Sequence, residues 1–237
     1  MNSTAEITKE LAPGGTLRAG INLGNPVLAQ GTPADPRGVT VDLARELSER
    51  IGLPLQMTTF DAAGKTFEAL KAGKLDLIFL AIEPVRANEI EFTPPYVIIE
   101  GVYLVRQDSP LKRAADADRT GVRIGVNRNS AYDLFLTRTL KNAELVRGES
   151  GLKLFEQQKL EAGAGIRQPL TAYAKAHPGV RLLDGRFMEI RQAMGVPKGR
   201  LAAARYLRSF IEEMKGNGFV ADALRRSNQD ATVAPPE

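Results

Sequence analysis

The sequence predicts an α/β protein of two lobes, each a sheet flanked by helices. With 237 residues, 43% of them hydrophobic, the chain can bury a substantial core. Strand patterns alternate with helix patterns along the chain, which favours parallel sheets. The alternation runs through two cycles, separated by a long β-branched segment at residues 92–105. At about 150 residues per domain, this length fits one large domain or two small lobes.

The first cycle of strands and helices follows a polar N-terminal segment. It shows both the alternating pattern of strands and the helical spacing of apolar residues. Alternation predicts strands, helical spacing of apolar residues predicts helices, and Gly52 and Gly73 mark helix ends. A nearly continuous apolar run, residues 75–82, is typical of a strand buried on both faces. The expected order is strand, helix, strand, helix, strand at residues 16–22, 39–51, 55–60, 66–72 and 75–82.

The second cycle follows a crossing strand and a linker. Residues 92–105 begin with a proline pair and continue as a long β-branched strand, and the polar residues 106–120 follow as a linker. Strands and helices then alternate at residues 121–127, 130–141, 145–146, 152–159, 160–166, 170–176 and 180–183. An amphipathic helix at 200–215, closed by Gly216, a short helix at 219–225 and a Pro-rich tail end the chain.

These cycles predict a discontinuous first lobe, residues 1–105 and 195–237, and a second lobe, residues 106–194. Open α/β sheets bind ligands beyond the carboxyl ends of their strands. Two such edges facing each other would form a binding cleft.

Composition excludes several classes of function. The chain has no Cys and one His, His177, so disulfides, thiolate metal sites, a cysteine nucleophile and two-His metal motifs are excluded. The net charge of +4, without a basic block, does not indicate nucleic acid binding. Walker loops, dinucleotide fingerprints and Ser-His-Asp arrangements are missing. We therefore expect no metal and no cofactor.

Targeting signals are equally sparse. No run approaches the roughly 18 apolar residues of a membrane span, and the first residues lack the basic stretch and apolar region of a secretory signal. The protein is then either cytoplasmic or a mature chain with Met1 added.

Several short motifs occur in a characteristic order. They are Gly38-Val-Thr-Val-Asp-Leu-Ala44, Ala69-Leu-Lys-Ala-Gly-Lys-Leu-Asp-Leu-Ile78, Glu83-Pro-Val-Arg86, Phe92-Thr-Pro-Pro-Tyr96, Ile124-Gly-Val-Asn-Arg-Asn-Ser-Ala131 and Met194-Gly-Val-Pro-Lys198. Together the chain resembles the amino-acid-type (family 3) solute-binding proteins of bacterial ABC importers, over about residues 17–224.

The resemblance implies a periplasmic binding protein-like type II fold, with two lobes joined by a two-strand hinge. It also implies a monomeric extracytoplasmic protein that captures a small carboxylate-bearing ligand, an amino acid or other organic acid, between its lobes. The partner would be the membrane permease of the importer. The protein would then be periplasmic, its signal peptide having been removed.

In the first lobe, the resemblance places Arg86 as the clamp for the ligand carboxylate, which suits the planar fork of a guanidinium. A solvated surface arginine is the alternative. Glu83 stands where the family has Thr, and it could meet a ligand ammonium or pair with Arg86 or Lys65. Asn22 and Asn25 lie where the first loop touches the ligand, but they are also typical turn residues. Phe60 could cover the ligand or belong to the core.

In the second lobe, Asn129 and Ser130 match the Gly-Thr turn of the family, at a helix start that favours anions. The family's ammonium-binding Asp is missing, and Arg167 and Gln168 stand nearby. A second arginine would favour an acidic or non-amino carboxylate, unless Glu83 supplies the missing charge. Arg167 could equally open a helix and point to solvent.

Two other functions remain open at this level. Some members of the fold are dehydratases, and Glu83 and Asp61 are the candidate acid-base groups, but we expect no enzyme. The same bilobed domain could also be the sensor of a receptor, which would predict a membrane segment in a longer parent chain.

Overall fold

A computed structural model describes residues 4–237 and divides into two compact units. Unit 1 contains the chain up to residue 98 and from residue 191 onward, and unit 2 contains Ile99–Ile190. The chain passes from one unit to the other inside two long strands, β6 (Ile90–Arg106) and β11 (Met188–Pro197). The sequence placed these boundaries at residues 105 and 195. The division lies a few residues earlier because each crossing strand contributes residues to both units.

The sheet of unit 1 is mainly parallel. Its strands follow the order β4-β1-β5-β11-β6, in which β1 is parallel to β4 and β5, and β11 is antiparallel to β5. The bounds of the first three are Leu55–Phe60 for β4, Leu17–Asn22 for β1 and Leu77–Ala81 for β5. This is the doubly wound arrangement that the strand-helix alternation predicts, extended by an antiparallel strand.

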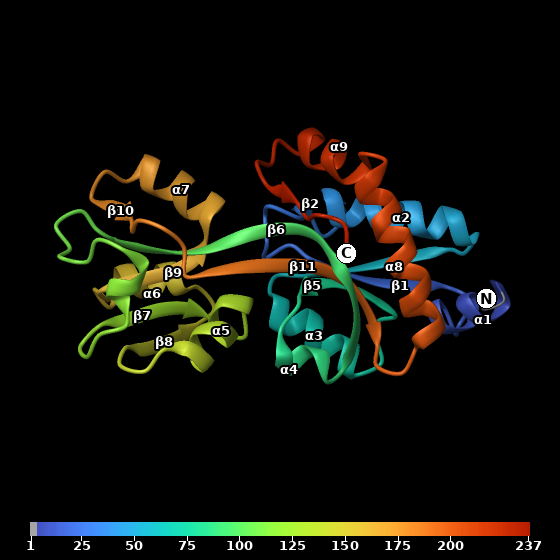
Figure 1. Ribbon diagram of the computed structural model, residues 1–237, viewed down its shortest axis with the longest axis horizontal. Coiled ribbons are helices and arrows are strands. Elements are labelled where there is room, and N and C mark those ends of the chain that lie inside the picture. Colours follow the sequence, from blue (N-terminus) through green and yellow to red (C-terminus); the bar gives the residue numbers. More distant parts are fainter. Residues whose placement is uncertain (1–3) are drawn as a thin grey trace. The chain divides into compact units, whose positions relative to one another are not determined.

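Helices cover both faces of this sheet. Helix α3 (Ala63–Lys71) packs on one face over a cluster that contains Leu75 and Ile78. Gly20 of β1 lies beneath it, where an added Cβ would be 2.6 Å from a Leu75 methyl group. Figure 1 shows α2 (Val39–Ile51), α8 (Leu201–Gly216) and α9 (Phe219–Arg226) on the side opposite α3 and the short helix α4 (Pro84–Ala87).

A buried carboxylate links the N-terminal and C-terminal segments of unit 1. Asp76 is fully buried and accepts hydrogen bonds from Arg18 Nε at 2.7 Å and Arg200 Nη1 at 2.9 Å. Arg200 also donates to the Glu10 carbonyl at 2.8 Å, at the end of α1 (Thr4–Leu11). Helix α1 was not predicted in this polar N-terminal segment, because it depends on packing against α8.

The C-terminal tail completes unit 1. Strand β12 (Thr232–Val233) pairs with β6, and the Ala234 N–H donates to the Tyr96 carbonyl at 3.0 Å. The buried Lys215 ammonium donates to the carbonyls of Pro95 at 3.1 Å and Pro235 at 2.9 Å. The tail therefore packs along β6.

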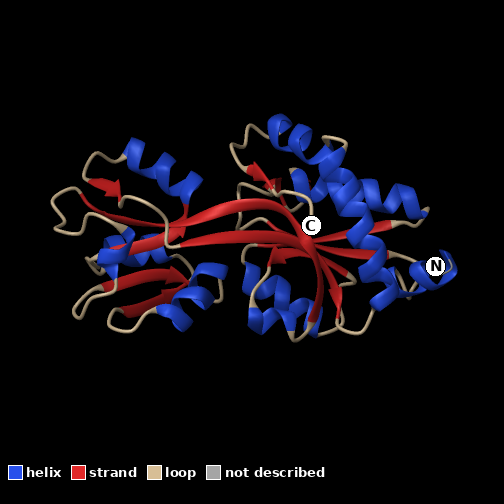
Figure 2. Cartoon of the chain, viewed as in Figure 1, coloured by secondary structure: helices blue, strands red, loops and turns tan. Residues whose placement is uncertain are grey.

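Unit 2 repeats the parallel pattern on a smaller scale. Strand β7 (Arg123–Asn127) lies between β8 (Glu144–Gly148) and β9 (Ala162–Ile166), parallel to both, and β9 is antiparallel to the second half of β6. Strand β10 (Val180–Leu182) pairs with β6 as well. Helices α5 (Ala131–Thr139), α6 (Gly151–Gln157) and α7 (Arg167–Ala176) accompany these strands, with a 3-10 turn at Ala114–Ala117 (Figure 2).

Besides α1, the sequence prediction lacks α4, β12 and the hairpin of β2 (Gln30–Thr32) and β3 (Asp35–Arg37). These elements are short and have no periodic pattern. Of β11, only the end was expected, as the return crossover at residues 194–198, although its start alternates, with buried Met188 and Ile190 beside exposed Glu189 and Arg191. Helix α8 runs through Gly216, and the left-handed turn falls at Gly218 (φ 86°) instead. Within residues 4–237, no helix is long and apolar enough to cross a membrane.

Candidate functional site

Unit 1 brings most of its predicted site residues to one sheet edge. Asn22 and Phe60 end adjacent parallel strands and are register partners. Glu83 and Arg86 follow β5, the other neighbour of β1. Since these strands run in parallel, the residues after their carboxyl ends share the edge where open α/β sheets bind ligands.

Arg86 and Glu83 form the charged part of this edge. Arg86 is 1% exposed and Glu83 is 2% exposed, so Arg86 is not the solvated arginine of the alternative interpretation. Arg86 Nη1 donates to the Ala81 carbonyl at 3.1 Å. Burial lowers the pKa of Arg86 to about 10, against the opposing effect of the Glu83 charge. The guanidinium therefore stays protonated at neutral pH.

The two asparagines take part in turns. Asn22 Oδ1 accepts the Gly24 N–H at 3.0 Å, and Asn25 Oδ1 accepts the Val27 N–H at 3.2 Å. Both are side-chain turns of the kind that Asn commonly forms. Phe60 packs against the cluster under α3, so its ring contributes to the core of unit 1.

In unit 2, Asn129 and Ser130 precede α5. Ser130 Oγ accepts the Asp133 N–H at 3.1 Å and thus caps the helix. Asn129 is in the left-handed region (φ 59°), and its N–H donates to Asp133 Oδ2 at 2.8 Å. Asp133, which was not among the predicted site residues, is buried and also accepts a hydrogen bond from Arg147 Nε at 2.8 Å. Its signal was present as Ser-x-x-Asp, a capping-box spacing.

Arg167 opens α7 and belongs to a second ionic group of unit 2. Its guanidinium forms an ion pair with Glu100 of β6 and donates to the Gly185 carbonyl at 2.9 Å. Arg186 Nη1 lies 2.8 Å from the other Glu100 oxygen. The hydrogen bond from Arg186, together with that from Arg167, lowers the pKa of Glu100 despite partial desolvation. The Arg167 guanidinium is thus paired with a carboxylate of the chain itself.

Unit 2 also gathers its predicted residues at one edge. Asn129 and Ser130 follow β7, while Arg167 and the half-buried Gln168 follow β9, and these strands are parallel neighbours. Glu100 was not expected here. An acidic residue inside the β-branched run of residues 92–105 was the available signal.

Asp61, a candidate acid-base group, is exposed at the end of β4. Lys65 Nζ lies 2.8 Å from its carboxylate, and this contact lowers the pKa of Asp61. A low pKa suits an ion pair better than proton transfer near neutral pH. In the described part of the chain, no group of three or more His, Asp or Glu side chains is arranged to hold a metal ion.

The two units, with their parallel strand edges, have the periplasmic binding protein-like type II fold. Residues 17–227 match the family model "Bacterial extracellular solute-binding proteins, family 3", and the chain belongs to this family. Comparison with curated protein sequences finds no match.

Solved structures share the fold at low sequence identity. A mutant of ArgBP from T. maritima has a TM-score of 0.77 at 20% identity, covering 94% of this chain and 100% of its own. An L-cysteine solute receptor of Neisseria gonorrhoeae has a TM-score of 0.77 at 22% identity, with coverages of 95% and 93%. A histidine kinase sensor domain has a TM-score of 0.77 at 19% identity, with coverages of 92% and 98%.

Proposed function

We propose that this protein binds a small α-amino acid and delivers it to the permease of an ABC importer. The observation that carries the proposal is Arg86, a buried and protonated guanidinium at the carboxyl edge of the unit 1 sheet. A guanidinium in this setting binds a carboxylate strongly, because both groups leave water together and form two parallel hydrogen bonds.

The charge of Glu83 favours an amino acid over a dicarboxylate. Glu83 lies three residues before Arg86 and acts on it electrostatically, so the same edge offers a positive and a negative group. An α-amino acid carries the complementary pair. The dicarboxylate alternative depended on Arg167 as a second free cation, but Arg167 is paired with Glu100.

Relatives of the same fold support this ligand class. The T. maritima protein is named ArgBP, the Neisseria gonorrhoeae protein is a receptor for L-cysteine, and a putative binding component from Wolinella succinogenes was solved with lysine. We propose that the protein closes around its solute by a hinge motion in β6 and β11, with solute shifting the population toward the closed state.

A thermal-shift screen over amino acids, dicarboxylates and aromatic acids tests the ligand class. A solute that binds only the folded protein raises the unfolding midpoint by mass action, by about 2.7 kcal/mol of stability at a hundredfold excess over Kd. We expect an α-amino acid to give the largest rise. A screen in which only dicarboxylates stabilise the protein would overturn this choice.

Arg86→Lys then tests the clamp by calorimetry. Lysine keeps the charge in this buried position but loses the planar fork, so affinity for the solute should fall about 10- to 100-fold. Arg205→Lys, at an exposed position of α8, is the matched control and should leave affinity unchanged. If Arg86→Lys binds within about threefold of the parent protein, the clamp assignment is wrong.

Glu83→Gln separates the two roles of Glu83. If Glu83 holds the ammonium of an amino acid, the substitution should remove most of the binding. If it only repels anions, the same substitution should tighten the binding of a dicarboxylate.

A further inference from the structure

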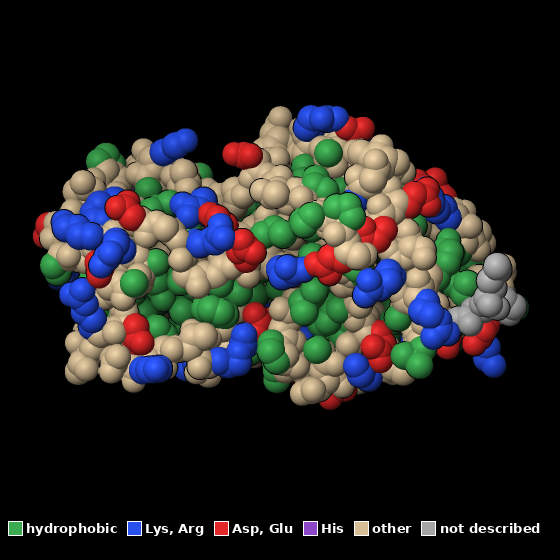
Figure 3. Space-filling view, viewed as in Figure 1, with side chains coloured by type: hydrophobic (Ala, Val, Ile, Leu, Met, Phe, Trp, Pro, Cys, Tyr) green, Lys and Arg blue, Asp and Glu red, His purple; other side chains and the backbone are tan. Residues whose placement is uncertain are grey.

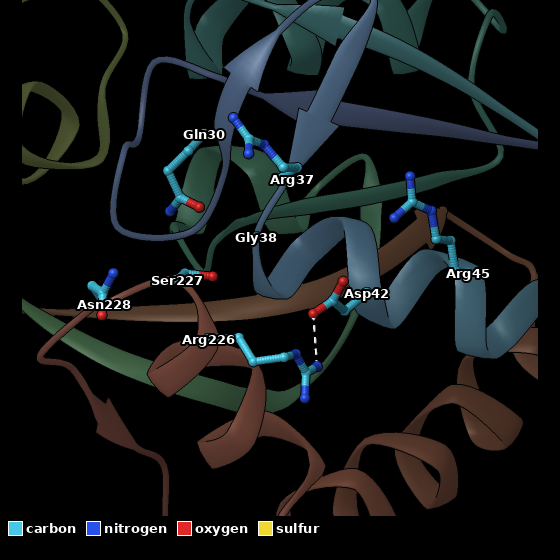
Figure 4. A pocket seen from close by; sticks show the side chains of 8 residues that line it. All are labelled: Gln30, Arg37, Gly38, Asp42, Arg45, Arg226, Ser227 and Asn228. Atoms are coloured by element: carbon cyan, nitrogen blue, oxygen red, sulfur yellow. Dashed lines mark hydrogen bonds and ion pairs between the residues drawn. The ribbon is translucent and has the colours of Figure 1, made fainter.

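Unit 1 contains a pocket of about 450 Å³ that includes none of the predicted solute-binding residues. Three segments surround it: the β2-β3 hairpin, the first half of α2, and the end of α9 (Figure 4). It is lined by Gln30, Arg37, Gly38, Asp42, Arg45, Arg226, Ser227 and Asn228, most of which have polar or charged side chains. The volume lies in the range of small-molecule sites, about 300–1,000 Å³.

Local backbone geometry fixes these segments. Gly38 has a φ of 112°, and an added Cβ would lie 2.6 Å from the Leu28 carbonyl oxygen, so only glycine lets β3 turn directly into α2 here. After α9, Asn228 takes a left-handed φ of 53°, and the Gln229 N–H donates to the Leu224 carbonyl at 3.0 Å. This helix-end motif gives the residues after Arg226 a defined position.

The lining has an excess of positive charge. Arg226 Nη2 lies 2.9 Å from Asp42 Oδ2 and neutralises the one acidic residue of the lining. Arg37 is 3.7 Å from Asp35, but both side chains are about 70% exposed, so this pair is weak. Within residues 4–237, Arg45 takes part in no ion pair. Two guanidinium groups therefore keep donors for a ligand.

Arginines outnumber acidic residues in the lining of this pocket, whereas basic and acidic side chains are intermixed over the face seen in Figure 3. Three arginines around one small space repel one another, and an anion in that space removes the repulsion. Guanidinium groups also match the geometry of phosphate and carboxylate oxygens.

We propose that this pocket binds a small organic or inorganic polyanion with at least two negative charges. Arg37 and Arg45 supply the free donors, and Arg226 turns from Asp42 to the bound anion. The pocket shares no residue with the proposed solute site. The protein would therefore bind a second ligand, of a different chemical class.

Calorimetric titration of the full chain with pyrophosphate, at constant and low ionic strength and up to about 10 mM, tests the proposal. We expect saturable binding that the double variant Arg37→Gln/Arg45→Gln weakens at least about tenfold. Arg205→Gln removes the same type of charge from an exposed position outside the lining and should change affinity less than about twofold. Asp42→Asn releases Arg226 and should tighten binding several-fold.

Three results would overturn the proposal: no saturable binding, equal binding by the double variant, or an equal loss in Arg205→Gln. The double variant should bind pyrophosphate more weakly and Asp42→Asn more tightly. A loss of folding would weaken binding in both variants, so the two explanations are distinguishable. Binding of the solute from the thermal-shift screen should be unchanged in the double variant. Failure of the amino acid proposal would therefore leave the pyrophosphate result interpretable by itself.

Discussion

Asp76→Asn should be among the most destabilising single substitutions in unit 1. The fully buried carboxylate accepts hydrogen bonds from Arg18 Nε at 2.7 Å, Arg18 Nη2 at 2.9 Å and Arg200 Nη1 at 2.9 Å. Asparagine keeps the shape, but its amide NH₂ faces guanidinium donors and its charge is lost. Breaking a buried ionic group costs about 3–5 kcal/mol.

The two arginines are partly exposed, at 35% and 23% of their side chains, so they regain water and reduce this cost. We therefore expect a loss of about 2–4 kcal/mol in the free energy of unfolding, or about 5–15 °C in the unfolding midpoint. Urea unfolding followed by circular dichroism measures it. The control Glu68→Gln removes an exposed carboxylate 3.4 Å from Lys71 and should cost less than about 0.5 kcal/mol.

The effect of Asp76→Asn should also depend on pH. Burial raises the pKa of Asp76, but the hydrogen bonds from Arg18 and Arg200 outweigh it and leave the pKa below its usual value. A lowered folded-state pKa stabilises the protein above the unfolded value of about 3.9, and this stability is lost as the pH falls through the folded value. The difference between the proteins should shrink below about pH 4. If the difference in free energy of unfolding between the two proteins does not change with pH, or is under about 0.5 kcal/mol at pH 7, Asp76 is not a stabilising ionised carboxylate.

Two further substitutions test local interactions. Lys215→Met leaves the carbonyls of Pro95 and Pro235 without their donor, so the free energy of unfolding should fall by about 1–3 kcal/mol. Proteolysis of the tail, followed by mass spectrometry, should also become faster, and an equally resistant tail would contradict this. Gly151→Ala places a Cβ 2.6 Å from the Gly125 carbonyl oxygen and should cost about 1–3 kcal/mol in urea unfolding, whereas Gly179→Ala meets no neighbour and should be neutral.

Elements with strong periodicity were predictable from the sequence. Residues 39–51 and 55–60 match α2 and β4 at both ends, and Gly52 ends α2 in the left-handed region as expected. Local signals such as helical spacing and glycine stops are sufficient there. In contrast, α1 and β12 were not predictable, because each is stabilised by partners distant in sequence, α8 for the first and β6 for the second.

The candidate site shows the same limit. The resemblance indicated Arg86 and Ser130 by their place in motifs, and capping by Ser130 followed from its position before a helix. The pairing of Arg167 with Glu100 could not be predicted, because 67 residues separate the two. That one contact changes the expected ligand, since it removes the cation on which the dicarboxylate alternative depended.

The discontinuity of unit 1 has a consequence for synthesis on the ribosome. Strand β11 lies between β5 and β6 in the sheet order, yet about 90 residues of unit 2 are translated before it emerges. At a synthesis rate of roughly 5–20 residues per second, β5 and β6 lack their common neighbour for about 5–20 s. During that interval the nascent chain presents unpaired strand edges that invite aggregation. Unit 2, which is continuous, can complete its fold first, and chaperone protection of the nascent chain should matter most while residues 99–190 are being made.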